Sequence, residues 1–415
     1  MAKLRTISMA EMKSHTLAKP YVPSVTGLKR GDSGVQVDRL QQYLQKFGYL
    51  NAGARTAGFD DSTEQALRKF QRLNHLPETG TLGDETLAKI SQPRCGFPDS
   101  GGASGPLGEF TLQGGKWNKT NITYSFANTT ADLTEAEVKR AFYQALLLWA
   151  EVTPLTFNEV AAGGAADMIL RFAPGDHGCG YPFDGPSGVL AHGFYPPPNG
   201  TYPGDIHFDE AETWSVNTPP TGFDLTTVAA HEIGHALGLA HSSINGALMY
   251  AYYGGAHRNL ESDDISGIQA IYGAVWRQPN WRWCSKCEGL HFGGNTPGRC
   301  PAGGGHITTG SGNYALAHNT SVVPGQNNWR YCSKCEGLHF GGNTPGVCPA
   351  GGGHTAAGSG NYTLAHEDST ANGQSNWRYC NKCEGLHFGG NGPGVCPAGG
   401  GHIMNPSGNY TLFHL

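Results

Sequence analysis

The sequence contains little charge and no long apolar run. Only 15% of its 415 residues are charged, the formal net charge is −5, and the lysines and arginines form no basic block. Nucleic acid is therefore not expected as a partner. No stretch of about 18 apolar residues is present, so no membrane span is predicted. The first 24 residues include Lys3 and Arg5 but lack the apolar segment of about seven residues typical of a signal peptide, so none is visible.

The chain also lacks an even number of cysteines. It has eleven, of which nine follow residue 280 and the other two are Cys95 and Cys179. An odd count argues against a closed set of disulfides, so each cysteine needs its own explanation. A length of 415 residues exceeds one ordinary domain, and about two to four domains are expected.

Residues 231–241 read HEIGHALGLAH and carry the strongest chemical signal in the chain. On a helix, His231 and His235 stand one turn apart on one face, so both imidazoles can reach the same ion. Glu232 lies beside them, where it can take a proton from a zinc-bound water. Gly238 can adopt the positive φ that ends the helix, and His241 can then supply a third ligand. The pattern predicts a catalytic zinc site with its fourth position open.

With Met249 further along the chain, this segment resembles the zinc helix and Met-turn of the metzincins. Ser242 directly after the third histidine resembles the matrixin branch, the matrix metalloproteinases. The resemblance implies an α+β catalytic domain over residues 110–274, with a twisted, mainly parallel five-stranded sheet and three helices. It also implies hydrolysis of peptide bonds by zinc-activated water, with Glu232 as the general base.

Two tyrosines after the Met-turn, Tyr250 and Tyr253, resemble the wall of a matrixin S1′ pocket, to which Met249 also belongs. The resemblance implies a preference for an apolar P1′ residue, the residue that comes directly after the cut bond.

Residues 27–92 form an earlier unit in which Val37, Leu40, Leu44 and Phe47 recur at helical spacing. This stretch resembles the small helical peptidoglycan-binding-like domain, which occurs both as a glycan binder and as the propeptide of matrixins. The segment directly after it, PRCGFPD at residues 93–99, favours the propeptide.

The PRCGFPD segment resembles the matrixin cysteine switch. A thiolate is a strong zinc ligand, so Cys95 can fill the fourth position on the ion and exclude water. In the family, Arg94 and Asp99 pair to hold this loop. We therefore expect an N-terminal extension at residues 1–26 and a helical propeptide with its switch at residues 27–99.

A Gly/Ser/Pro-rich stretch at residues 100–109 is expected to be a flexible activation linker. Phe110-Thr111-Leu112 resembles the start of mature matrixins. If cleavage falls between Glu109 and Phe110, family analogy implies that the new ammonium group pairs with Asp264.

Between residues 167 and 214, acids, histidines and glycines are frequent. His177, His192 and His207 match three structural-zinc ligands of the family, but Cys179 stands where the family has an aspartate. Cys179 can replace that ligand, since thiolates bind zinc well, or it is a free thiol and the site is weakened. We favour ligation.

The same region predicts calcium sites. Asp184, Asp209 and Glu212 resemble the side-chain ligands of one family calcium loop, and carboxylates suit this hard ion. Asp167 and Asp205 resemble a second site whose usual glycine run is interrupted. The alternative reading of these acids is a solvated loop.

From residue 281 a unit of 48 residues occurs three times, each with Trp-x-x-Cys-x-x-Cys, Cys-Pro-Ala-Gly-Gly-Gly-His and Gly-Asn-Tyr. Three cysteines and one histidine per unit meet the needs of a tetrahedral zinc site, which would compensate for a small core. Disulfides and free thiols are the alternatives, and His291 or His318 could replace His306. The expected ligand sets are Cys284, Cys287, Cys300 and His306; Cys332, Cys335, Cys348 and His354; Cys380, Cys383, Cys396 and His402.

No activity is assigned to these repeats at residues 275–415, which we expect to be small, metal- or disulfide-stapled units. Exposed Trp, Tyr and His side chains could grip substrate, a glycan or a surface.

These patterns together predict a latent zinc endopeptidase that also binds calcium, acts on protein or peptide substrates, and is monomeric and extracellular. A glycan- or cell-wall-binding protein in which proteolysis is secondary is the alternative, and cell-wall hydrolysis is a weaker third.

Overall fold

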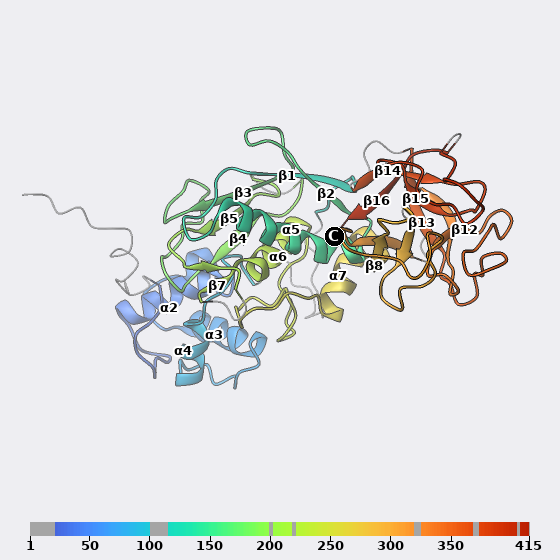
Figure 1. Ribbon diagram of the computed structural model, residues 1–415. Coiled ribbons are helices and arrows are strands. Elements are labelled where there is room, and N and C mark those ends of the chain that lie inside the picture. Colours follow the sequence, from blue (N-terminus) through green and yellow to red (C-terminus); the bar gives the residue numbers. More distant parts are fainter. Residues whose placement is uncertain are drawn as a thin grey trace, which may run out of the picture. The chain divides into compact units, whose positions relative to one another are not determined.

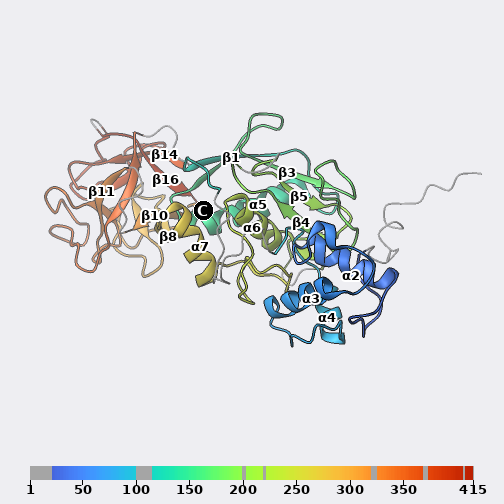
Figure 2. The same cartoon turned by 180° about the vertical axis from the view of Figure 1, so that it is seen from behind.

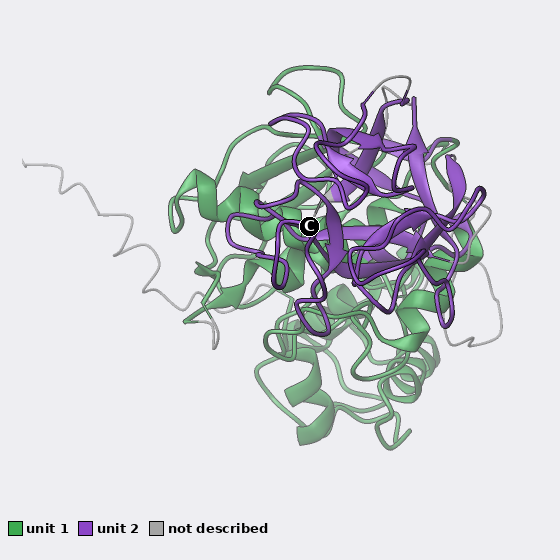
Figure 3. Ribbon diagram, turned by 45° about the vertical axis from the view of Figure 1, so that its right-hand side comes forward, with its two compact units in different colours: residues 1–118, 123–148, 159–271 green, residues 119–122, 149–158, 272–415 purple. Residues whose placement is uncertain are grey.

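The computed structural model describes residues 21–99, 115–198, 202–217, 221–318, 325–367, 373–404 and 407–414. Most of the predicted N-terminal extension, the activation linker and the Glu109–Phe110 cleavage point lie outside the described residues. The chain divides into two compact units (Figure 3), residues 1–118, 123–148 and 159–271 in one and residues 119–122, 149–158 and 272–415 in the other. None of the described helices is long and apolar enough to cross a membrane.

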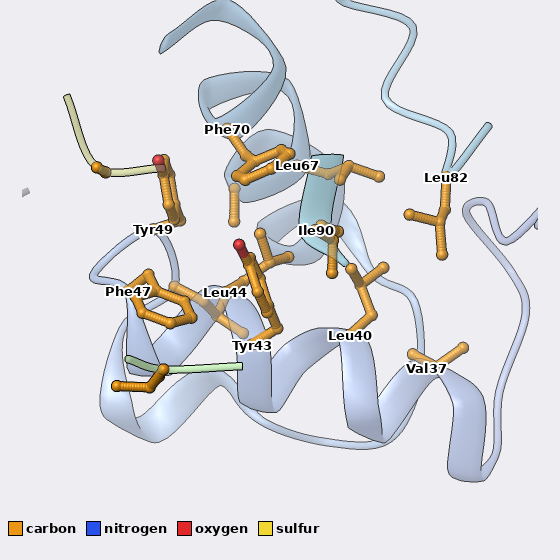
Figure 4. Packing of buried hydrophobic residues seen from close by; sticks show 14 of the residues in the cluster. Val37, Leu40, Tyr43, Leu44, Phe47, Tyr49, Leu67, Phe70, Leu82 and Ile90 are labelled. Atoms are coloured by element: carbon orange, nitrogen blue, oxygen red, sulfur yellow. The ribbon is translucent and has the colours of Figure 1, made fainter. Parts of the chain in front are cut away.

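The first helices among the described residues pack around one apolar core. They are α2 (Val35–Lys46), α3 (Asp61–Leu73) and α4 (Asp84–Ile90), with a short 3-10 turn η1 (Ala52–Ala54) after α2. Asp60 caps α3, because its carboxylate accepts a hydrogen bond from Thr63 N at 2.9 Å. The helical spacing of Leu40 and Leu44 places both in the same buried cluster as Phe70 of α3 and Ile90 of α4 (Figure 4), so the predicted apolar face is the buried one.

A five-stranded sheet comes next along the chain, in the order β2-β1-β3-β5-β4. Its strands are β1 (Asn121–Phe126), β2 (Thr156–Glu159), β3 (Met168–Ala173), β4 (Ala191–Gly193) and β5 (Ile206–Asp209). Strand β3 runs parallel to β1 and β5, whereas β4 is antiparallel to β5. A short parallel pair, β6 (Trp214–Ser215) and β7 (Phe223–Asp224), leads to the next helix. The α+β class and the five-stranded sheet implied by the resemblance are confirmed.

Three helices accompany this sheet (Figures 1 and 2): α5 (Glu135–Val152), α6 (Leu225–Ala236) and α7 (Ser262–Tyr272). A capping box begins α5, since Thr134 N donates to Glu137 Oε2 at 2.9 Å and Glu137 N donates to Thr134 Oγ1 at 3.3 Å. Helix α6 packs against β4 and β5, which brings its histidines to the edge of the sheet where β4 lies.

The three C-terminal repeats share one nine-stranded sheet rather than forming three separate units. Each repeat contributes a long strand, a short strand and a closing strand. They are β8 (Trp276–Trp283), β9 (Leu290–Phe292), β10 (Tyr314–His318), β11 (Gln326–Tyr331), β12 (Leu338–Phe340), β13 (Tyr362–His366), β14 (Gln374–Tyr379), β15 (Leu386–Phe388) and β16 (Tyr410–His414). The closing strands β10, β13 and β16 pair with one another, so the repeats meet at a common centre.

The expectation that the repeat tryptophans are exposed is wrong. Trp281, Trp329 and Trp377 are each 0% exposed and form the core in which the three repeats meet. The Trp281 ring packs edge-on against Tyr362 of the next repeat, with ring centres 5.2 Å apart. The sequence of one repeat does not predict this burial. A single unit is too small to cover its tryptophan, which becomes a core residue only when three units join.

Candidate zinc centres and their surroundings

Helix α6 contains His231 and His235, and it ends before Gly238, so that His241 lies beyond the helix. The Asp224 carboxylate caps its first turn by accepting from Thr227 N at 3.0 Å. After the helix ends, Gly238 has φ 107° and its Cα lies so close to Gly115 O that a methyl group would collide with it. This reversal turns the chain back and brings His241 to His231 and His235.

The three histidines are buried, and each is anchored through Nδ1. His231 Nδ1 lies 2.7 Å from Leu248 O and His235 Nδ1 lies 2.7 Å from Leu239 O. These contacts favour the tautomer with the proton on Nδ1, which leaves Nε2 free for a metal. Nε2 of His231 and of His241 is buried without a hydrogen-bond partner among the described residues. Burial also lowers the pKa of His231 to about 3, which keeps the ring neutral. This donor set fits a zinc ion.

Cys95 reaches the same point from the segment that follows α4. Its Sγ lies 3.5 Å from His235 Nε2 and 3.5 Å from Glu232 Oε2. The ligand atoms of Cys95 and the three histidines all lie within 4.8 Å of one another. Tetrahedral zinc with Zn–S of about 2.3 Å and Zn–N of about 2.0 Å separates sulfur from nitrogen by about 3.5 Å. The thiol therefore stands where a fourth ligand would stand.

Arg94 and Asp99 hold this segment in place. Two guanidinium N–H groups of Arg94 face the Asp99 carboxylate, one of them at 3.0 Å, and both side chains are buried. The guanidinium also lies over the Phe47 ring at 3.6 Å and donates to Tyr252 OH at 3.1 Å. Burial opposes ionisation of Asp99, but Arg94 and His241 outweigh it and hold the pKa of Asp99 below its usual value.

Asp99 has a second role that the motif did not reveal. Its Oδ1 lies 2.9 Å from Nδ1 of His241, the third predicted zinc ligand. The carboxylate thus orients a metal ligand while it pairs with Arg94.

Glu232 is 0% exposed beside the histidines. Burial raises the pKa of this carboxyl to about 8, against the opposing effect of hydrogen bonds from Cys95 and the Gly193 backbone. Its Oε1 is buried without a hydrogen-bond partner among the described residues. Such a group can accept and return a proton near neutral pH.

Met249 and the two predicted pocket tyrosines lie on the loop after the zinc motif. Met249 is buried, and the Leu248 and Met249 amides donate to the Asp264 carboxylate at 2.8 and 3.0 Å. A cavity of about 250 Å³ opens beside Glu232 and is lined by Tyr250 and Tyr253, among others. Asp264 therefore already accepts hydrogen bonds from this turn. The predicted pairing of Asp264 with a new N-terminal ammonium group involves Phe110, which lies outside the described residues.

A second cluster brings together His177, Cys179, His192 and His207. Cys179 Sγ lies 3.0 Å from His177 Nε2 and 3.4 Å from His192 Nε2. Burial, with smaller effects from His177 and Arg171, lowers the pKa of His207 to about 4, so the ring is neutral. Three imidazoles and one thiol converge, and this set fits a zinc ion with Cys179 in the place of the family's aspartate.

The three acids of the first predicted calcium site lie close together. Burial raises the pKa of Asp209 to about 7 and that of Glu212 to about 8, and Asp184 adds to both shifts. Asp209 Oδ2 is buried without a hydrogen-bond partner among the described residues. Carboxylates that repel one another in this way fit a divalent cation.

The second predicted calcium site, at Asp167 and Asp205, has fewer features of a cation site than the first. Asp167 Oδ2 accepts from Thr123 N at 2.7 Å and from Thr123 Oγ1 at 2.8 Å, and burial raises the pKa of Asp205 to about 6. A calcium ion bound by this pair stays a prediction.

Sequence reasoning missed Tyr21. The predicted N-terminal extension includes it, yet its side chain packs on the core formed by α2, α3 and α4, and its hydroxyl donates to Asp184 Oδ2 at 2.5 Å. Lys46 of α2 lies over the Tyr21 ring at 4.6 Å and thereby fixes it. A lone tyrosine beyond the helical pattern carries no local signal for such a contact.

In the repeats, the three predicted ligand sets each come together, with His306, His354 and His402 as the histidines. His318 instead packs on the Tyr362 ring. None of the eleven cysteines, all of which lie in the described part of the chain, forms a disulfide.

The chain is similar to known proteins in two regions. Residues 116–273 match the matrixin family model, and residues 33–90 match that of the putative peptidoglycan binding domain. The chain is 45% identical to the neutrophil collagenase of Homo sapiens over 242 residues, which is 56% of this chain and 49% of the relative. It is 41% identical to the interstitial collagenase of Equus caballus over 268 residues, 63% and 53% of the two chains.

A third relative, stromelysin-2 of Rattus norvegicus, is 42% identical over 246 residues, which is 57% of this chain and 49% of that one. The chain thus spans about half the length of the curated relatives it matches.

Proposed function

We propose, from the premise that residues 116–273 form a matrixin domain, that this chain is a zinc-dependent endopeptidase made in a latent form. One observation carries the proposal: the Cys95 thiol and three neutral histidines converge on one point, beside a buried glutamate. A bound zinc ion would supply Lewis acidity and a water that ionises near neutral pH.

The side chains of this chain divide the remaining work. His231, His235 and His241 would hold the metal through Nε2. Glu232, with its pKa raised by burial, would take the proton of the attacking water and pass it to the leaving amine. In the full-length chain Cys95 fills the position that water needs, so removal of the propeptide would precede catalysis.

The cavity of about 250 Å³ supports an apolar P1′ preference. Val228, Ala247 and Leu248 line it together with Tyr250, and it opens next to Glu232. An apolar side chain could enter it while the preceding carbonyl lies over the metal site. The relatives named collagenases suggest collagen-like or denatured collagen substrates, and an extracellular site of action accords with them.

The glycan-binding alternative is not favoured. Tyr43 and Phe47 of the peptidoglycan-binding-like domain are buried and contact Arg94 of the switch, so these aromatic side chains serve latency here.

The test is cleavage of casein and a collagen-like peptide by the processed enzyme, with and without chelator. Glu232→Ala is expected to lower kcat/KM by roughly 100- to 10,000-fold at unchanged zinc content, the range for loss of a general base. Glu135→Ala, at an exposed glutamate in the first turn of α5, is the matched control and should retain activity. Full activity of the Glu232 variant, or activity that resists chelation, would contradict the proposal.

A further inference from the structure

The three C-terminal repeats are joined in a closed ring. In the first junction, Phe292 N donates to Glu336 O at 2.7 Å and Asn295 Nδ2 donates to Glu336 Oε2 at 3.2 Å. The second repeat makes the same contacts with the third, through Phe340, Asn343 and Glu384. The third returns to the first, because Phe388 N donates to Glu288 O at 2.8 Å and Asn391 Nδ2 to Glu288 Oε2 at 3.1 Å. Each repeat therefore has a neighbour on both sides.

Each repeat also holds a thiol-imidazole cluster with the dimensions of a zinc site. Cys284 and Cys300 have their sulfurs 3.9 Å apart, and Cys287 Sγ lies 3.6 Å from His306 Nδ1. A tetrahedral zinc ion with Zn–S of about 2.3 Å and Zn–N of about 2.0 Å requires about 3.8 Å and about 3.5 Å for these separations. The other two repeats give 4.0 and 3.6 Å, and 3.9 and 3.5 Å. A disulfide requires about 2.05 Å between sulfurs, which none of these pairs approaches.

A second histidine supports each ligand histidine. The His291 ring stacks on the His306 ring with centres 4.3 Å apart and planes 11° apart, and His291 is 0% exposed. The pairs His339–His354 and His387–His402 repeat this at 4.6 and 4.4 Å. The stacking leaves His306 Nδ1 facing the sulfurs, so the buried partner positions a ligand without replacing it.

The clusters are not independent, because each contacts the neighbouring repeat. Gly394 of the third repeat has φ 54° and presses against the Cys287 carbonyl of the first, so closely that a methyl group would collide with it. Val395 beside it packs against the cluster formed by Cys284, Cys287 and Cys300. Gly298 presses on Cys335, and Gly346 on Cys383, in the same way. Each cysteine turn is thus shaped partly by the preceding repeat around the ring.

We propose that the C-terminal module is a ring of three Cys₃His zinc sites that bind and lose their ions as one cooperative unit. The ions would complete three small cores that share one apolar centre, and loss of one ion would loosen the turn on which the next site depends. This role is structural and separate from the catalytic zinc.

The experiment uses the full-length chain, zinc counting and peptide-resolved alkylation of the cysteines. The three repeats give distinguishable peptides, since Arg299, Val347 and Val395 precede the last cysteine of each. Before chelation we expect about five zinc ions per chain, one for each cluster. During chelation, the nine repeat cysteines should become reactive together, with one shared rate. Three separate rates, disulfides, or at most two zinc ions per chain would overturn the proposal.

A matched pair of variants tests the coupling. Gly394→Ala and Gly400→Ala both place alanine at positive φ in the third repeat, at 54° and 65°, but only position 394 meets the first repeat. Gly394→Ala is expected to speed alkylation of Cys284, Cys287 and Cys300 by about tenfold, a factor that corresponds to about 1.4 kcal/mol. Gly400→Ala should speed the labelling of the first repeat less, because its strain reaches that repeat only through the third zinc site. Equal effects of both variants on that repeat, or no effect of either, would contradict coupling between neighbours.

Discussion

Cys95 and the cysteines of the repeats face histidine nitrogens at almost the same distance, but the chain brings them there differently. Cys95 Sγ lies 3.5 Å from a histidine that is 140 residues away, and the segment that carries it is held by ion-pair and aromatic contacts. Cys287 Sγ lies 3.6 Å from a histidine only 19 residues away, within one tight unit. Closing the shorter loop costs less conformational entropy.

If both thiols bind zinc as proposed, Cys95 would be a removable ligand and Cys287 a permanent one. A cut after residue 99 would leave Cys95 held at the histidines by non-covalent contacts alone, whereas no single cut outside a repeat would separate Cys287 from its partners. The same thiol-zinc chemistry can therefore serve latency in one region and stability in the other, and chain connectivity decides which.

The largest contrast is expected between Cys348→Ser and Cys95→Ser. Cys348→Ser removes one ligand of a structural site, where zinc binding is worth on the order of 10 kcal/mol, so zinc content and the Tm of the module should both fall. Cys95→Ser should leave Tm nearly unchanged and activate the uncut chain, by roughly 100-fold if the closed form exceeds the open form by about 99 to 1. Elemental analysis, calorimetry and a peptide-cleavage assay measure the three quantities. If the Cys348→Ser chain kept the zinc content and the Tm of the parent, Cys348 would not be a structural zinc ligand, and the contrast with Cys95 would fail.

Arg94 offers an intermediate effect. Arg94→Ala leaves the Asp99 carboxylate buried without its partner, which costs about 3–5 kcal/mol and should open the switch. Arg94→Lys keeps the charge but not the two parallel N–H contacts, so its effect should be smaller. The rate at which a thiol reagent labels Cys95 in the uncut chain measures the opening, and the repeat cysteines in the same sample serve as the internal control. Unchanged labelling of Cys95 in both variants would show that the ion pair does not hold the switch.

Tyr21→Phe should give the smallest effect. It removes one hydrogen bond to Asp184, worth about 1 kcal/mol, and so weakens a second attachment of the propeptide. Because the Tyr21 hydroxyl occupies an oxygen of a predicted calcium ligand, the uncut variant should bind Ca²⁺ about fivefold more tightly, as titration calorimetry can measure. After the propeptide is removed, variant and parent should bind Ca²⁺ equally. A difference that persists in the processed enzyme would mean that Tyr21 acts in another way.

The sequence predicted the local parts of these sites well. His231 and His235 share a helix face by periodicity, and Gly238 has the positive φ that the motif requires. The tyrosine contact at Asp184 and the pairing of Asp99 with His241 could not be predicted, because each joins segments more than 100 residues apart through one side chain. Local patterns carry no information about such encounters.

The sequence by itself determined which residue types can hold metal, through short spacings such as the four residues from His231 to His235 and the three from Cys284 to Cys287. Only the tertiary structure decided that the repeats close into a ring with their tryptophans inside. Nearly identical repeats offer nearly identical surfaces, so their sequence cannot say which copy supplies each contact. Burial of Trp281, Trp329 and Trp377 in one shared core settles that arrangement, because no single repeat has enough apolar surface to cover its own tryptophan.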